Sequence, residues 1–265
     1  MSISPGSAFK WLMVIVAFGI AAVLAWGLVA GLSGTLGEPV GDQVDVPPAN
    51  ERIPELAVDE WRIAVLGDSL ARGTGDSTGK GIGGNLETLL EKRGESVEWV
   101  LNLGVNGSKT ADLEARLASA AAGSLGEANL IVVSIGANDV FSETRDSNAE
   151  LREIDPETIV GRVETVISRI REVNPEGRLF MIGLYNPFPA RGETKLIDGA
   201  VARWNAMLST RLARYDGVVV PTADLFVFAD RLSADRFHPS AEGYELISER
   251  IVAALGSFDR GARLQ

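Results

Sequence analysis

Few residues in this sequence can carry covalent chemistry. The chain has one histidine, His238, and no cysteine, so disulfides, thiolate nucleophiles and His-rich or Cys-based metal sites are excluded. Ser69 follows an apolar run at 63–66 and then Gly67 and Asp68. A serine hydroxyl acts as a nucleophile at neutral pH when a neighbouring base takes its proton, and His238 is the one imidazole available. The residue types therefore indicate serine–histidine chemistry.

Three further residues would complete such a site. Asp235, three residues before His238, is placed to orient an imidazole base. Negative charge that develops on an acyl oxygen needs preset donors, which the backbone N–H groups of Ser69 and Gly104 and the side-chain amide of Asn138 would supply. Each residue also has a simpler explanation, since Asn138 could cap a helix, Gly104 could only form a turn, and His238 could lie in a surface loop. Their joint occurrence favours the catalytic interpretation.

The secondary-structure elements decide whether these residues can meet. From residue 59 to 258, short apolar runs alternate with amphipathic stretches, which is typical of a parallel sheet with helices on both faces. The predicted strands are 62–66, 97–103, 130–135, 178–184 and 217–220. The predicted helices are 84–93, 110–121, 157–173, 194–214 and 241–255. Because the carboxyl ends of parallel strands open on one edge, we expect the candidate residues to converge there.

Four blocks of the sequence, in this order, resemble the SGNH (GDSL) hydrolases, and two further stretches, Arg72-Gly73-Thr74-Gly75 and Tyr185-Asn186-Pro187-Phe188, resemble their bacterial lipase/acylhydrolase branch. The blocks are Gly67-Asp68-Ser69-Leu70, Asn102-Leu103-Gly104-Val105-Asn106-Gly107, Gly136-Ala137-Asn138-Asp139 and Asp235-Arg236-Phe237-His238-Pro239. The resemblance extends over roughly residues 61–255. It implies an α/β protein with a three-layer α/β/α, flavodoxin-like domain and a five-stranded parallel sheet. It also implies hydrolysis of carboxylic esters or thioesters.

The resemblance also assigns roles to single residues. It implies that Ser69 is the nucleophile and one oxyanion donor, with Gly104 and Asn138 as the other donors. His238 is then the base, and Asp235 orients it. Two alternatives stay open: an acyl or acetyl transferase or deacetylase acting on cell-envelope glycans through the same acyl-enzyme, and a non-catalytic binding module. The intact set of residues disfavours the binding module.

Two stretches partly match nucleotide-binding motifs, but neither has the spacing or position in the chain that such a site needs. Gly79, Gly81 and Gly84 match G-x-G-x-x-G, but a dinucleotide site needs that motif directly after a strand. The stretch 75–80 resembles a phosphate-binding loop, but its spacing is one residue too short. We therefore expect neither a cofactor nor a metal.

The charge of the chain restricts its partners. There are 25 basic and 36 acidic residues, which gives a net charge of −11, and no basic cluster is interleaved with aromatic residues. Such a surface is poorly suited to a phosphate backbone, so nucleic-acid binding is not expected. The expected partner is an ester-containing small molecule, lipid or cell-envelope substrate.

The N-terminal part has a different character. Residues 11–32 form a run of 22 residues without a charge, which as a transmembrane helix can cross a hydrocarbon core of about 30 Å. A lysine before the run and acidic residues after it place 1–10 in the cytoplasm, and predict a single-pass, membrane-anchored protein with an extracytoplasmic catalytic domain. Cleavage as a signal peptide, which would give a secreted enzyme, is the alternative. The remaining predicted parts are a Pro/Gly linker at 33–58, the hydrolase domain at 59–258 and a tail at 259–265.

Overall fold

The structure is a computed structural model, and it describes residues 60–118, 122–141, 156–188 and 194–261. The predicted cytoplasmic segment, membrane anchor and linker lie outside these ranges, so they stay predictions. Within the described ranges, none of the helices combines the length and the apolar character needed to cross a membrane.

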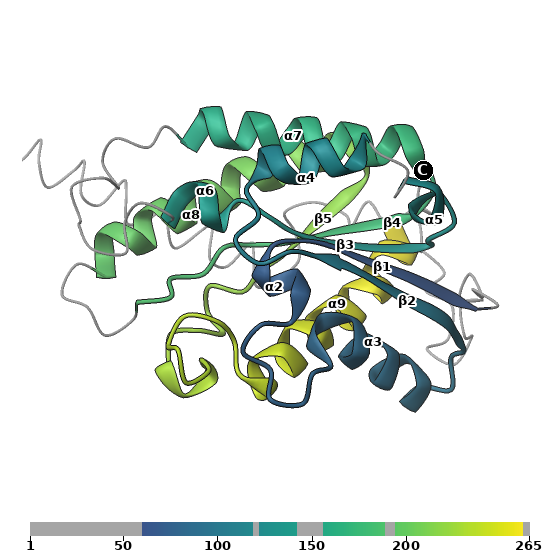
Figure 1. Cartoon of the computed structure of the whole chain (residues 1–265), viewed down its shortest axis with the longest axis horizontal. Coiled ribbons are helices and arrows are strands. Elements are labelled where there is room, and N and C mark those ends of the chain that lie inside the picture. The colour runs from purple at the N-terminus through teal and green to yellow at the C-terminus, as the bar shows by residue number, and fades with distance from the viewer. Residues whose placement is uncertain (1–59, 119–121, 142–155, 189–193, 262–265) are drawn as a thin grey trace, which may run out of the picture. The chain divides into compact units, whose positions relative to one another are not determined.

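A five-stranded parallel sheet forms the centre of the domain (Figure 1). Its strands are β1 (Trp61–Gly67), β2 (Val97–Gly104), β3 (Leu130–Ser134), β4 (Arg178–Ile182) and β5 (Gly217–Val220). They lie in the order β2-β1-β3-β4-β5, which is the flavodoxin-like order. The predicted α/β fold class and all five predicted strands are confirmed.

Helices cover both faces of this sheet and give the domain its three layers (Figure 1). One face carries α4 (Thr110–Leu117), α5 (Ala122–Gly126), α6 (Ala137–Phe141), α7 (Pro156–Val173) and α8 (Thr194–Leu212). The other face carries α3 (Gly81–Lys92) and α9 (Ala241–Gly261). Along β1, Ala64 and Leu66 pack into the first layer, and Ile63 and Val65 into the second. Because both faces are covered, the central strands are continuous apolar runs without polar alternation.

The shortest helices are the ones that the sequence patterns did not predict. The one-turn helix α2 (Ser69–Arg72) directly follows β1, and α6 follows β3 in the same way. A single turn is too short to produce a helical period in the sequence, although these turns carry Ser69 and Asn138. At the other end of the chain, α9 continues to Gly261 and so extends into the predicted tail.

Candidate active site

The turn between β1 and α2 presents Ser69 at the carboxyl edge of the sheet. Gly67 has a φ of 135°, and a Cβ atom at this position would lie 1.7 Å from the carbonyl oxygen of Ser134, so only glycine fits. Asp68 caps α2, because its Oδ1 accepts from the Leu70 N–H at 3.0 Å. Ser69 is the first residue of α2, where backbone N–H groups have no acceptor within the helix. Its N–H therefore remains available to a ligand.

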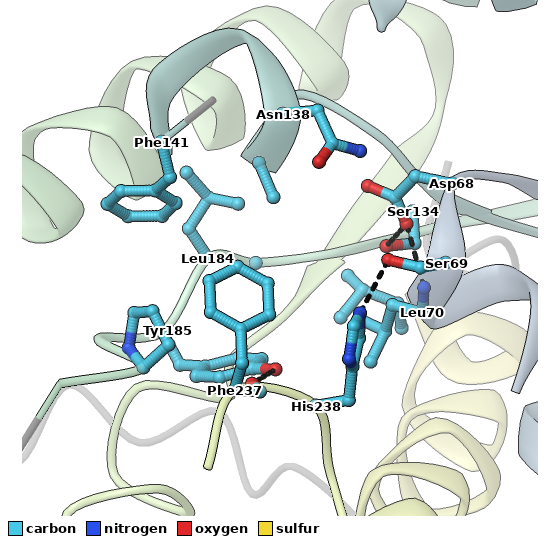
Figure 2. Close-up of a pocket in the computed structure, with 14 residues that line it drawn as sticks. Asp68, Ser69, Leu70, Ser134, Asn138, Phe141, Leu184, Tyr185, Phe237 and His238 are labelled. Carbon is cyan, nitrogen blue, oxygen red and sulfur yellow. Dashed lines mark hydrogen bonds between the residues drawn. The ribbon is translucent and has the colours of Figure 1, made fainter. Parts of the chain in front are cut away.

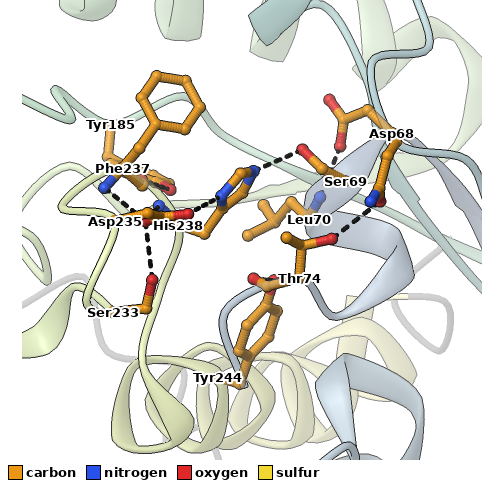
Figure 3. Close-up of polar contacts among 11 residues, drawn as sticks. Asp68, Ser69, Leu70, Thr74, Tyr185, Ser233, Asp235, Phe237, His238 and Tyr244 are labelled. Atoms are coloured by element: carbon orange, nitrogen blue, oxygen red, sulfur yellow. Dashed lines mark hydrogen bonds and ion pairs between the residues drawn. The ribbon is translucent and has the colours of Figure 1, made fainter. Parts of the chain in front are cut away.

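His238 connects Ser69 with Asp235 (Figure 3). Its Nε2 lies 2.8 Å from Ser69 Oγ, and its Nδ1 lies 2.6 Å from Asp235 Oδ2. The other carboxylate oxygen of Asp235 accepts from Ser233 Oγ and from the backbone N–H groups of Phe237 and His238. Partial burial would raise the pKa of Asp235, but these hydrogen bonds outweigh it and hold that pKa well below its ordinary value. Asp235 is therefore ionised at neutral pH.

The loop that carries His238 is fixed from two sides. The Tyr185 hydroxyl, just after β4, donates to the carbonyl oxygen of Phe237 at 2.8 Å. On the other side, a Cβ atom at Gly75 would lie 2.9 Å from His238 Cβ and 2.6 Å from the Pro239 carbonyl oxygen. The glycine-rich stretch after α2 thus packs directly against the histidine loop, which keeps the imidazole in reach of Ser69.

Asp68 adds a buried titratable group beside Ser69. The residue is 1% exposed, and its Oδ1 accepts from Ser134 Oγ at 3.1 Å as well as from the Leu70 N–H. Burial raises the pKa of Asp68 to about 6, against the opposing hydrogen bonds from Leu70 and Ser134. The sequence patterns gave no reason to expect this carboxyl group to be buried and perturbed.

In the structure, the Gly104 N–H, which was predicted to be an oxyanion donor, already has an acceptor within the protein. This N–H donates to Asn102 Oδ1 at 2.9 Å, whereas the next one, of Val105, donates to the Gly67 carbonyl oxygen at 3.0 Å. Because successive N–H groups of a strand point to opposite sides, the Gly104 N–H points away from β1. A Cβ atom at Gly104 would lie 2.2 Å from the Arg72 backbone nitrogen. Glycine is required here for close packing against α2.

Gly107, the second glycine of the same block, is a candidate donor that the sequence analysis did not single out. Its φ is 75°, and among the described residues its N–H has no hydrogen-bond partner. Asn106 Oδ1 accepts from Thr74 Oγ1 at 2.8 Å, which ties this loop to the Ser69 turn. Asn138 Nδ2 donates to the Ser108 carbonyl oxygen at 3.0 Å and keeps a second hydrogen for another acceptor. The Asn-Gly pair was the available signal, since it favours a turn with positive φ.

A largely apolar pocket opens from these polar groups (Figure 2). Ser69, Asn138 and His238 lie at one end and Phe141 lies at the other, and the ring of Phe237 lies between them, 5.0 Å from the His238 ring. The remaining apolar lining residues are Leu70, Ala137, Ile182, Leu184, Tyr185 and Pro187. Such a pocket suits an apolar group attached to the atom that Ser69 would attack.

Acidic side chains near the site are dispersed. Among the residues that the structure describes, no three His, Cys, Asp or Glu side chains are grouped so that they could hold a metal ion. The expectation that the protein uses neither metal nor cofactor stays a prediction.

A flavodoxin-like domain with a Ser-His-Asp series at its carboxyl edge has the arrangement of a serine hydrolase. The chain belongs to the GDSL-like lipase/acylhydrolase family, whose sequence model matches residues 65–246. It is 32% identical to the uncharacterized protein YpmR of Bacillus subtilis (strain 168) in an alignment of 207 residues, which covers 73% of this chain and 80% of that protein. The predicted family is thus confirmed, and the protein is a GDSL-type serine ester hydrolase.

Two solved structures share the fold. The lipase Lip_vut3 from a goat rumen metagenome has a TM-score of 0.60 at 23% identity, covering 73% of this chain and 97% of its own. The acetylxylan esterase Axe2 of Geobacillus stearothermophilus has a TM-score of 0.59 at 15% identity, covering 76% of this chain and 95% of its own. At these identities the likeness establishes the architecture alone.

Proposed function

We propose that the protein hydrolyses carboxylic esters through an acyl-enzyme on Ser69. The observation that carries the proposal is the position of His238, 2.8 Å from Ser69 Oγ and 2.6 Å from Asp235 Oδ2. With its proton on Nδ1, the imidazole donates to Asp235 and its Nε2 accepts the proton of Ser69. The deprotonated Oγ forms a bond to the acyl carbon, and the ionised Asp235 stabilises the imidazolium that results.

The same histidine then completes the turnover. It gives its proton to the leaving alkoxide, so that the alcohol departs and the acyl group remains on Ser69. A water molecule enters, His238 takes one of its protons, and the hydroxide oxygen attacks the acyl carbon. The carbon–oxygen bond to Ser69 breaks, its Oγ recovers the proton from His238, and the carboxylic acid leaves.

We assign the oxyanion donors to three chain segments that hydrogen bonds tie to one another. They are the backbone N–H of Ser69 itself, the second Nδ2 hydrogen of Asn138 and the backbone N–H of Gly107. The first lies at a helix N-terminus, the second points from α6, and the third has no partner among the described residues. Donors that are fixed before the reaction stabilise the tetrahedral intermediate without reorganising.

The substrate class follows from the pocket. Its apolar wall accepts the acyl part of an ester or thioester, and among the described residues that line it only Asp68 and His238 have an acidic or basic side chain. Removal of acetyl groups from a cell-envelope glycan, or their transfer to one, is the second candidate. It is supported by the acetylxylan esterase activity that Axe2 is named for. We further propose that residues 11–32 anchor the enzyme with its catalytic domain outside the cytoplasm, on the basis of their uncharged sequence.

A kinetic comparison tests this function. The wild-type protein is expected to hydrolyse p-nitrophenyl acetate, and Ser69→Ala is expected to lower kcat by several orders of magnitude, as loss of the nucleophile does in serine proteases. Circular dichroism and the thermal midpoint serve as controls for folding. Adding a soluble saccharide to the assay detects acetyl transfer, because a transferase yields acetylated sugar in place of acetate, whereas acetate released from an acetylated glycan detects the deacetylase.

A further inference from the structure

One guanidinium lies behind the site and touches two of its chain segments. Arg116, near the end of α4, places Nη2 3.1 Å from the Gly67 carbonyl oxygen and 3.0 Å from Ser108 Oγ. Its side chain extends back toward the N-terminal end of its helix, as helical side chains do. The Gly67 carbonyl oxygen also accepts from the Val105 N–H at 3.0 Å, so both of its lone pairs are used.

The contacts of Arg116 join the segments that carry the three oxyanion donors. Gly67 is two residues before Ser69, and Ser108 follows Gly107. The Ser108 carbonyl oxygen accepts from Asn138 Nδ2 at 3.0 Å. A displacement of Ser108 would therefore move two donors at once, and a displacement of Gly67 would move the third.

The helix that supplies Arg116 is itself fixed to the site. Asp139, the neighbour of Asn138 on α6, accepts from both the backbone N–H and the Oγ1 of Thr110, each at 2.9 Å. Thr110 is the first residue of α4. The helix is therefore anchored to the Asn138 segment at one end, and Arg116 returns from its other end to the Gly67 and Ser108 segments.

We propose that Arg116 is a positioning residue that holds the three oxyanion donors in their mutual geometry. The inference rests on the proposed function of the site, and Arg116 itself does not contact the substrate. A guanidinium suits this task, because its planar fork holds two acceptors in fixed directions, whereas lysine offers a single mobile point charge. Misplacing a catalytic group by about 1 Å can lower a rate by about a hundredfold.

The first experiment compares Arg116→Met with a matched arginine elsewhere. Arg171 is also half-buried and bonded to backbone oxygens, those of Tyr215 at 2.8 Å and Gly177 at 2.7 Å, but it lies at the amino ends of β4 and β5. Arg116→Met is expected to lower kcat by about tenfold to a hundredfold while KM changes little, because only the transition state uses the donors. Arg171→Met is expected to lower the thermal midpoint and to leave kcat unchanged.

A transition-state analogue gives a readout that loss of stability does not change. The affinity for a small alkylboronic acid, which becomes tetrahedral on Ser69, should fall in parallel with kcat/KM in Arg116→Met and stay constant in Arg171→Met. Unchanged kcat and boronate affinity in a folded Arg116→Met protein would overturn the proposal. An equal loss of kcat in both arginine variants would overturn it too, because the effect would then be general.

Smaller changes decide the question even if Arg116→Met does not fold. Arg116→Lys and Ser108→Ala each remove part of the contact, and each should lower kcat, with losses that are not additive in the double variant because both act through one interaction. Additive losses, or no losses, would contradict the proposal. A wild-type protein without esterase activity would instead refute the proposed function, whereas an active enzyme with normal Arg116 variants would refute only this inference.

Discussion

At the scale of residues, most residues of the site could be predicted from the chemistry of their side chains, but the environment of each residue could not. Ser69, Asp235 and His238 were predicted because the chain has a single imidazole and the distances in sequence are suitable. Gly104 alone was named as the glycine donor, because the alternation of N–H directions at the end of β2, which gives its N–H an acceptor on Asn102, is not visible in the sequence. The burial of Asp68 depends on β3, which is remote in sequence.

The buried carboxyl group of Asp68 should make the stability of the fold depend on pH. Its pKa is about 6 in the folded protein and 3.8 as a free group, so the folded state binds the proton more tightly. Stability should therefore fall as pH rises from about 4 to 6, by an amount on the order of 3 kcal/mol. The Asp235 contribution has the opposite sign, because its pKa is lowered, and it is lost only as pH falls below about 4.

Urea unfolding of the wild type and of Asp68→Asn between pH 4 and 7 measures this pH dependence of stability. The variant keeps an oxygen that can accept from the Leu70 N–H, but it cannot ionise. Its free energy of unfolding should therefore rise relative to that of the wild type as pH rises. Parallel pH dependences in the two proteins would show that Asp68 does not titrate in this window.

The proposed donor role of Asn138 can be tested by its replacement. Asn138→Ala removes the proposed donor and is expected to lower kcat by about 10²–10³ with a smaller change in KM. It also removes the contact to the Ser108 carbonyl oxygen, so a loss of about 1 kcal/mol of stability should accompany it. Steady-state kinetics and urea unfolding separate the two effects. Near-normal kcat in the folded variant would exclude the donor role.

At the scale of elements, hydrophobic patterns predicted the strands and long helices, but not the order of the strands or the one-turn helices. β1 and β3 are buried on both faces and so stand out in the sequence as continuous apolar runs. Their adjacency in the sheet, by contrast, arises from the crossover of the chain and leaves no local signal. The turns α2 and α6 are set by Gly67 and Gly136, whose positive φ values are properties of the folded backbone.

The helix α6 is expected to determine which acyl-chain lengths the enzyme prefers. Phe141 at its end lines the pocket and meets the ring of Phe188 edge to face at 6.4 Å. Phe141→Val would lengthen the pocket, so the ratio of kcat/KM for octanoate over acetate esters should rise by about tenfold or more. The matched control is Phe180→Val, which removes a buried ring on the opposite face of β4. A ratio that is unchanged, or that rises equally in the control, would show that Phe141 does not limit the length of the acyl chain that the pocket accepts.

At the scale of the whole molecule, the proposed topology can be tested in cells. Residues 11–32 are expected to hold the full chain in the membrane fraction, with the hydrolase domain outside the cytoplasm. Protease added to intact cells should then remove the domain. A mature N-terminus just after this run, in a soluble extracellular fraction, would establish a cleaved signal peptide instead.

The central claim is that one nucleophile, Ser69, serves the whole enzyme, and covalent labelling tests it most directly. A fluorophosphonate reacts with a serine that an adjacent base activates, and peptide mass spectrometry locates the adduct. The account predicts a single adduct on Ser69 in the wild-type protein, none in Ser69→Ala, and loss of ester hydrolysis in proportion to labelling. An adduct on another residue, or hydrolysis that persists after Ser69 is fully labelled, would contradict it.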